Sequence, residues 1–142
     1  MSKILVVDDE AIIAMQLEER LNAMGYTVAG MAATGQDAID KAQKSAPDLV
    51  LMDIVMPGKL NGIEAARSIG EMDIPVVFVT SYADDAIIEK AKQVRPYGYI
   101  VKPFNEQEIK AAIEVALFRK AAERELRLAA SVRSRRDGGI SL

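Results

Sequence analysis

The sequence contains neither cysteine nor histidine. The absence of cysteine excludes disulfides, thiolate metal sites and cysteine nucleophiles. The absence of histidine excludes a Ser-His-Asp triad, a histidine-ligated zinc ion and an imidazole general base. Chemistry on this chain must therefore use carboxylates, lysine, hydroxyl groups and bound ions.

Long apolar runs are absent too. No run approaches the roughly 18 residues that indicate a membrane-spanning helix. The residues before the first apolar run lack the positive cluster of a signal peptide. We therefore predict no membrane partner and a cytoplasmic location. The 142 residues, half of them hydrophobic and 27% charged, suit one domain with a sizeable core.

The formal net charge of −3 conceals an uneven distribution. Residues 1–118 carry 11 basic and 18 acidic side chains, whereas residues 119–142 carry 7 basic and 3 acidic ones. This shift in sign indicates a body followed by a basic appendage. Because the positive charges alternate with Glu123 and Glu125 in a helical pattern, a solvated helix is favoured over nucleic-acid binding.

Short apolar runs alternate with helix-like segments along the body. Three of the runs are almost continuous Val, Ile and Leu, which is typical of parallel strands covered on both faces. The expected strands are Ile4–Val7, Thr27–Met31, Leu49–Met52, Val76–Val79 and Tyr99–Val101. Five strands that alternate with five helices predict an α/β fold with a parallel sheet between two helical layers.

Helix signals separate these runs. Thr34 can cap one helix, which ends before Pro47, and Asn105 is a good N-cap for the fifth. The first helix carries a stripe at helical spacing that stops at Gly25. The stripe consists of Ile12, Ile13, Leu17, Leu21 and Met24. Further helices are expected at Gly62–Ile69, at Asp84–Val94 and from Asn105 to about Ala130.

Polar side chains follow the strands at their carboxyl ends, where ligands bind in open parallel sheets. Carboxylates favour Mg²⁺, or Mn²⁺, and a lysine and a hydroxyl can hold an anion beside the cation. A carboxylate nucleophile beside a metal is suited to forming an aspartyl phosphate. The residues are Asp8 and Asp9 after the first strand, Asp53 after the third, Thr80 and Ser81 after the fourth, and Lys102 after the fifth.

Each of these residues also has an ordinary structural explanation. Acidic residues favour a helix start, and Glu10 is assigned only that role. Asp53 could be a turn residue, Thr80 a helix cap and Lys102 a solvated charge. Their convergence on one edge of the sheet favours a functional site over these separate explanations.

These residues resemble the receiver domain of two-component response regulators. The segments that carry the resemblance are VVDDE, MDIVMP, FVTSY and YIVKPF, within residues 3 to about 120. The resemblance implies a flavodoxin-like sheet in the order 2-1-3-4-5, as in chemotaxis-type receivers. It divides the chain into a receiver domain, residues 1–120, and a basic helical extension with a flexible C-terminal tail, residues 121–142.

The resemblance also implies roles in phosphoryl transfer. Asp53 is expected to accept a phosphoryl group from a sensor histidine kinase or a phosphotransfer protein. Asp9 is expected to bind Mg²⁺ directly, with Asp8 acting partly through water and the backbone carbonyl of Val55 as a further ligand. Lys102 is expected to contact the acceptor carboxylate and the phosphoryl group. The chain would then be no enzyme beyond self-phosphorylation and autodephosphorylation.

A second set of residues is expected to respond to the phosphoryl group. Thr80 moves toward it, the small Ser81 leaves it room, and Tyr99 turns inward. The surface of the fourth helix, fifth strand and fifth helix then changes to regulate a downstream protein partner or dimerisation. Val55 and Tyr82 flank the phosphoryl group in the family pattern, and their bulk predicts slow dephosphorylation.

One segment departs from the family pattern. Four residues separate Pro57 from Gly62, where three are usual, and Gly58 can supply a positive φ. We expect the extra residue to alter the loop and not the chemistry, because the metal and acceptor positions lie upstream.

Other functions fit the sequence less well. A haloacid-dehalogenase type of enzyme needs a second Asp two residues after Asp53, where Val55 stands. A P-loop nucleotidase needs a glycine-rich Gly-Lys-Ser/Thr loop, which is missing. The acidic edge argues against a flavin-binding module, and a scaffold with a dead site would be expected to lack Asp53 or Lys102.

The segment after the body allows two interpretations. The 24 residues after Phe118 are too few for an output domain, which leaves a stand-alone receiver or a fragment of a longer regulator or kinase. An alanine-rich extension without a partner is one reading of this helix. The other is a homodimer through a second apolar stripe, Val115, Phe118, Ala122, Leu126, Ala129 and Val132.

Overall fold

A central parallel sheet organises the protein. The computed structural model describes residues 2–56, 61–81 and 85–141, with side chains described as far as residue 133. Five strands form the sheet in the order β2-β1-β3-β4-β5, which confirms the predicted order. They are β1 (Lys3–Val7), β2 (Thr27–Ala32), β3 (Leu49–Met52), β4 (Val76–Thr80) and β5 (Gly98–Val101).

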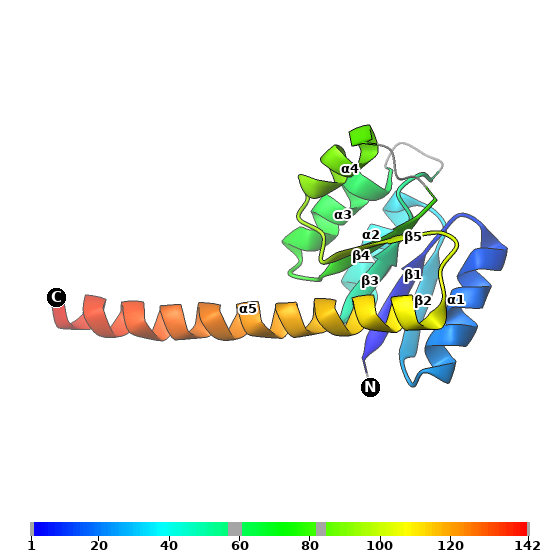
Figure 1. Ribbon diagram of the computed structural model, residues 1–142. Helices are drawn as coiled ribbons and strands as arrows, with labels where there is room; N and C mark the ends of the chain where they lie inside the picture. The colour runs from blue at the N-terminus through cyan, green and yellow to red at the C-terminus, as the bar shows by residue number, and fades with distance from the viewer. Residues whose placement is uncertain (1, 57–60, 82–84, 142) are drawn as a thin grey trace.

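Helices cover both faces of this sheet (Figure 1). Their bounds are α1 (Ala11–Ala23), α2 (Gly35–Ser45), α3 (Gly62–Glu71), α4 (Asp85–Lys92) and α5 (Glu106–Ser141). Helices α1 and α5 pack on one face, and α2, α3 and α4 pack on the other. None of the helices in the described part of the chain combines the length and apolar character needed to cross a bilayer.

Strand β1 shows why the apolar runs are continuous. Ile4 and Val6 point into the core under α1 and α5, whereas Leu5 and Val7 point into the core under α2 and α3. All four side chains are almost fully buried. Successive side chains of a strand face opposite ways, so a strand with helices on both sides needs apolar residues at every position.

Side-chain caps start several helices where the sequence predicts them. The Thr34 hydroxyl accepts the Asp37 N–H at 3.1 Å, and the Asn105 side chain accepts the Glu108 N–H at 2.8 Å. Gly25 follows α1 with φ of 92°, a conformation that glycine adopts without steric cost. These observations confirm the predicted starts of α2 and α5 and the predicted end of α1.

The apolar stripe predicted for α1 is partly wrong. Its buried residues are Ala14, Leu17 and Leu21, whereas the Ile12 side chain is 72% exposed. A two-residue step turns an α-helix by about 200°, so Ile12 lies on the side opposite Ala14. Ile12 is therefore surface and does not belong to the core.

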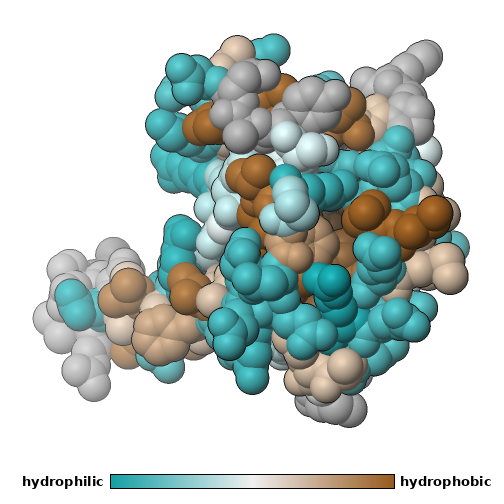
Figure 2. Space-filling model, turned by 45° about the vertical axis from the view of Figure 1, so that its right-hand side comes forward, coloured by the Kyte–Doolittle hydropathy of each residue, from teal (hydrophilic) through white to brown (hydrophobic). Residues whose placement is uncertain are grey.

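Helix α5 is longer than predicted. It runs to Ser141, past both Gly138 and Gly139, rather than ending near Ala130. Its first turns cover the sheet with Ile109, Ile113 and Ala116, and the rest leaves the body as a straight arm (Figure 1). Hydrophobic surface continues onto this arm (Figure 2). Whether its end is flexible stays a prediction.

Candidate functional site

The carboxyl ends of four neighbouring strands meet at one edge of the sheet. Backbone hydrogen bonds continue past the strand ends and hold the polar residues in register. The Asp53 N–H donates to the Val7 carbonyl at 2.9 Å, and the Lys102 N–H donates to the Thr80 carbonyl at 2.9 Å. The sheet order therefore brings together Asp8, Asp53, Thr80 and Lys102, four of the predicted site residues.

Three carboxylates gather at this edge. Oxygen atoms of Asp8, Glu10 and Asp53 lie within 4.8 Å of one another. Asp8 and Asp53 are only 3% and 6% exposed. The Glu10 side chain is 62% exposed. Two buried carboxylates this close repel each other unless a cation balances them.

Glu10 has a place in the site that the sequence reasoning missed. It occupies the N-cap position of α1 without a capping side-chain bond, and its carboxylate faces the site instead. Asp9, the predicted direct metal ligand, is exposed and lies outside this three-carboxylate cluster. The backbone bends at Asp9, and the Glu10 N–H donates to the Asp8 carboxylate at 2.9 Å, which holds Glu10 close to Asp8.

Lys102 supplies the balancing charge. Its ammonium nitrogen lies 2.8 Å from Asp8, 3.5 Å from Asp53 and 3.9 Å from Glu10, and its side chain is 11% exposed. Burial acts to lower the pKa of Lys102, but the hydrogen bond to Asp8 and the charges of the three carboxylates outweigh it and raise the pKa. Lys102 is therefore a firmly charged cation.

The pKa of the Asp53 carboxyl is raised, chiefly because burial disfavours its charged form. The neighbouring charge of Asp8 raises it further, while Lys102, the backbone N–H of Ile54 and a hydrogen bond with the Thr80 side chain oppose the shift. Thr80 is fully buried at the end of β4. Asp53 thus has a hydroxyl, an ammonium and a second carboxylate around it.

The structure describes three of the remaining predicted residues, Ser81, Tyr99 and Val55. Ser81 is exposed and lines, with Lys102, a cavity of about 360 Å³. Tyr99 is partly buried and packs edge-on against Phe78, with ring centroids 6.3 Å apart. The side chain of Val55 is 44% exposed, and the role of its carbonyl stays a prediction. Tyr82 and the loop of Pro57 to Leu60 lie outside the described residues.

The donor set fits a divalent cation of the Mg²⁺ or Mn²⁺ type. Such ions prefer oxygen ligands, and a site with one or two carboxylates and further oxygens suits Mg²⁺. The cluster of Asp8, Glu10 and Asp53 provides three carboxylates at suitable separation. A cation placed among them would take over the neutralisation that Lys102 now provides.

Comparison with known proteins identifies the class of protein that this fold and site define. A family model of the response regulator receiver domain matches residues 4–114. The chain therefore belongs to the response regulator receiver domain family, a CheY-like group of two-component signalling domains.

Curated relatives support this membership. The transcriptional regulatory protein PdtaR of Mycobacterium tuberculosis is 39% identical over 118 residues, covering 82% of this chain and 57% of PdtaR. The chemotaxis protein CheY of Thermotoga maritima is 34% identical, covering 78% of this chain and 93% of CheY. The chain thus spans little more than half the length of PdtaR and nearly the whole length of CheY.

Solved structures show the same fold. The signal receiver domain of a modulated diguanylate cyclase from Desulfovibrio desulfuricans G20 superimposes with a TM-score of 0.83 at 33% identity, covering 87% of this chain and 98% of that chain. The CheY chain in a CheX–CheY–BeF3–Mg complex from Borrelia burgdorferi gives a TM-score of 0.73 at 25% identity, covering 79% and 86%.

Proposed function

We propose that this chain is a phosphorylation-dependent receiver that accepts a phosphoryl group on Asp53 from a partner histidine kinase or phosphotransfer protein. The observation that carries the proposal is the position of Asp53, buried at the strand edge 3.5 Å from the Lys102 ammonium and hydrogen-bonded by Thr80. Because the chain contains no histidine, the phosphohistidine of the donor must lie outside these 142 residues.

The chemistry follows from these contacts. An Asp53 oxygen attacks phosphorus, the phosphorus–nitrogen bond of the donor breaks, and its electron pair stays on the imidazole nitrogen, which takes up a proton. Lys102 is placed to neutralise charge on the transferred group, and the Thr80 hydroxyl can donate to one of its oxygens. When bound, Mg²⁺ would add further charge neutralisation at the phosphoryl oxygens.

A small phosphodonor such as acetyl phosphate tests the proposal without the partner. With Mg²⁺, intact-mass spectrometry should show one added phosphoryl group, and none after chelation or in Asp53→Asn. Asp48→Asn is a matched control, because Asp48 lies at the opposite end of β3 and binds the Lys3 N–H instead. A phosphoryl group that persists in Asp53→Asn would overturn the assignment.

We also propose that Asp8 and Asp53 hold the metal with a third carboxylate. The resemblance assigns that role to Asp9, whereas Glu10 reaches the cluster in the described structure. Calorimetric titration with Mg²⁺ separates the two residues, since Asp9→Asn and Glu10→Gln remove one carboxylate each. The residue that acts as the ligand is the one whose loss weakens Mg²⁺ binding more. Loss of an outer-shell partner alone costs roughly 10- to 100-fold, so loss of a direct ligand should cost at least that much.

The switch is proposed for the surface made by α4, β5 and α5. Its support is that Thr80 is fully buried and that β5 pairs with β4, with Phe78 beside Tyr99. A phosphoryl group would bring about −1.5 to −2 charges beside Thr80 and bias the protein between two states. Amide NMR shifts induced by beryllofluoride and Mg²⁺ should extend to residues 84–101, and changes confined to the metal residues would contradict the switch.

We further propose a homodimer through the outer face of α5. The side chains of Val115, Phe118, Leu126 and Val132 are 55%, 75%, 71% and 48% exposed on this helix. They recur every three or four residues, with small Ala122 and Ala129 between them. A long isolated helix is only marginally stable in water, so burial against a second copy would stabilise the arm.

A further inference from the structure

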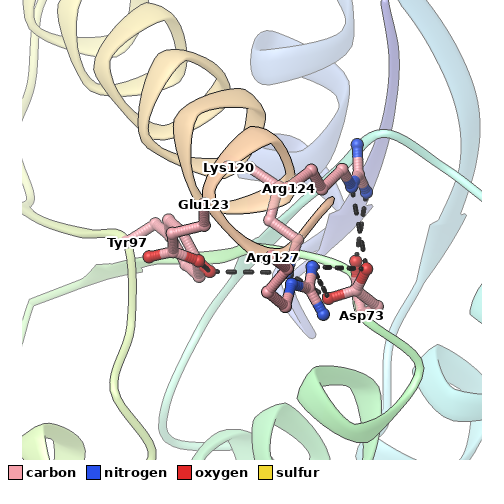
Figure 3. Close-up of polar contacts among 6 residues, drawn as sticks. All are labelled: Asp73, Tyr97, Lys120, Glu123, Arg124 and Arg127. Carbon is pink, nitrogen blue, oxygen red and sulfur yellow. Dashed lines mark hydrogen bonds and ion pairs between the residues drawn. The ribbon is translucent and has the colours of Figure 1, made fainter. Parts of the chain in front are cut away.

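A single carboxylate joins the projecting part of α5 to the body. Asp73 lies in the turn between α3 and β4 with φ of 65°. Its side chain accepts hydrogen bonds from Lys120 and, at 3.1 Å to each oxygen, from Arg127 (Figure 3). Its backbone carbonyl accepts a bond from Arg124 at 3.3 Å. Three cations from successive turns of α5 therefore converge on one residue.

A tyrosine makes a second connection beside the first. The Tyr97 hydroxyl donates to Glu123 and lies 3.4 Å from the Lys120 nitrogen. The Arg119 guanidinium stacks 4.7 Å from the centroid of the Tyr97 ring and donates to the Tyr97 carbonyl. We refer to Asp73, Tyr97, Lys120, Glu123, Arg124 and Arg127 as the clasp.

The clasp lies where the helix leaves the body. Lys120 is 6% exposed, although lysine is almost never buried without a partner. From Arg124 to Arg133, every described side chain of α5 is exposed. Within the described residues, the clasp is thus the last set of contacts between body and arm.

Each anchor of the clasp leads directly into a strand that ends at the phosphoacceptor site. Asp73 precedes β4, which ends at Thr80, and Tyr97 precedes β5, which carries Tyr99 and is followed by Lys102. The Tyr97 N–H also donates to the Val76 carbonyl at 2.8 Å, which ties the two strand starts together. A small displacement of either strand therefore reaches the clasp at its other end.

We propose that Asp73 is a positioning residue: through the clasp it fixes the direction in which α5 leaves the body, and it couples that direction to β4 and β5. The arm is then a rigid lever and not a tether. The coupling rests on the proposed function of Asp53, whereas the rigidity does not.

Distances between spin labels test the rigidity. The chain has no cysteine, so Lys44→Cys on α2 and Ser131→Cys on the arm give two unique labels at exposed positions. Labelled chains are diluted with unlabelled chains, so that pulsed electron resonance reports distances within one molecule. We expect a narrow distance distribution in the parent chain and a broad one in Asp73→Asn. Asparagine is chosen because it tolerates the positive φ of this position.

Matched variants separate the clasp from general effects. Glu71→Gln removes an exposed carboxylate from the end of α3 and should leave the distribution narrow. Arg127→Gln, at a 60% exposed side chain, should broaden it without disturbing the fold. Circular dichroism establishes that helix content is unchanged. An equally narrow distribution in Asp73→Asn and Arg127→Gln would overturn the proposal.

Beryllofluoride with Mg²⁺ tests the coupling. In the parent chain it should shift the mean label distance, and in Asp73→Asn that shift should be lost while the amide changes around Asp53 persist. A shift of equal size in both proteins would overturn the coupling. If beryllofluoride left the amides around Asp53 unchanged, the proposed function would fail, and the ligand-free distances would still decide the rigidity.

Discussion

Lys102 and Asp8 form the shortest ion pair of the site, with 2.8 Å between the ammonium nitrogen and a carboxylate oxygen. The pair lies across the sheet edge, between the end of β1 and the end of β5. It gives the buried Asp8 a permanent counter-charge. A divalent cation bound to Asp8 would share this role and would leave the Lys102 ammonium freer to contact the acceptor carboxylate of Asp53.

The first prediction concerns this counter-charge. Lys102→Met should destabilise the metal-free protein by about 3 kcal/mol or more, because removing one partner of a buried ion pair leaves the carboxylates uncompensated. Mg²⁺ should recover much of the loss. Urea denaturation with and without Mg²⁺ measures both effects. Lys92→Met is the control, since the exposed Lys92–Glu89 pair should contribute less than about 1 kcal/mol. Equal losses in both variants would contradict the role of Lys102.

The second prediction concerns the close approach of α3 to the acceptor. A Cβ on Gly62 would lie 1.9 Å from the Asp53 carbonyl oxygen, a distance that forces the helix start away from the strand end. Gly62→Ala should therefore cost at least about 2 kcal/mol of stability. Gly70, in the same helix, has open space around its Cβ position.

Gly70→Ala is the control, and its expected change in stability has the opposite sign. It should stabilise the protein by about 0.5–1 kcal/mol, because alanine loses less conformational freedom in a helix. Thermal or urea unfolding measures both variants. Stability that rises in Gly62→Ala as well would show that α3 does not lie against Asp53 in solution.

The third prediction concerns acid stability of the clasp. The hydrogen bond from Lys120, with help from Arg127, lowers the pKa of Asp73 to about 2 from its ordinary 3.8. A depressed pKa stabilises the folded state above the ordinary value, and this contribution is lost as pH falls through about 2. The effect is modest, since the Asp73 side chain is 46% exposed.

The measurement compares the parent chain with Asp73→Asn by urea denaturation across pH. The stability difference should be constant above about pH 5 and should shrink between the ordinary pKa and about 2. The charged groups facing Asp73 are Lys120, Arg124 and Arg127 of α5, and Asp48 lines the same hollow. Asp48→Asn is therefore measured alongside. A difference that grows toward low pH would contradict the sign.

The fourth prediction concerns the α5 dimer. Light scattering should give a dimer for the full chain and a monomer for Phe118→Glu, which puts a charge into the outer stripe. Truncation at Arg119 should also give a monomer. Ser131→Glu is the matched control, because Ser131 is also exposed but lies three or four residues from no member of the stripe, and so on another side of the helix. If the parent chain is monomeric both with and without phosphorylation, the proposed dimer through α5 is wrong.

The strands were predictable because their signal is local. Leu49–Met52 has four buried residues in a row, and such a short, continuous apolar run is typical of a strand with helices on both faces. The positions of Asp8, Asp53, Thr80 and Lys102 were predictable for a related reason. Parallel strands end at one edge, so residues after each strand are neighbours whatever the detailed packing.

Other features depend on geometry that no single segment encodes. The directions of Asp9 and Glu10 depend on how the backbone turns between β1 and α1, so the sequence alone did not indicate that Glu10 lies near Asp8 and Asp53. The Asp73 clasp brings together residues 47 to 54 positions apart, and its cations resemble ordinary solvated charge along the helix. Ile12 was misplaced because a four-residue run of Ala and Ile offers two possible faces.

The strand order also predicts that the strands carrying the site residues differ in how readily they open locally. Asp8 and Asp53 follow β1 and β3, which each have a strand on both sides, whereas Lys102 follows β5, which pairs only with β4. A strand with one neighbour opens at a lower free energy than a strand with two, so amide protons of β5 should exchange with solvent before those of β1 and β3. Asp8 and Asp53 thus follow strands that are expected to open later than β5. Lys102 follows an edge strand, which is expected to open before β1 and β3 do.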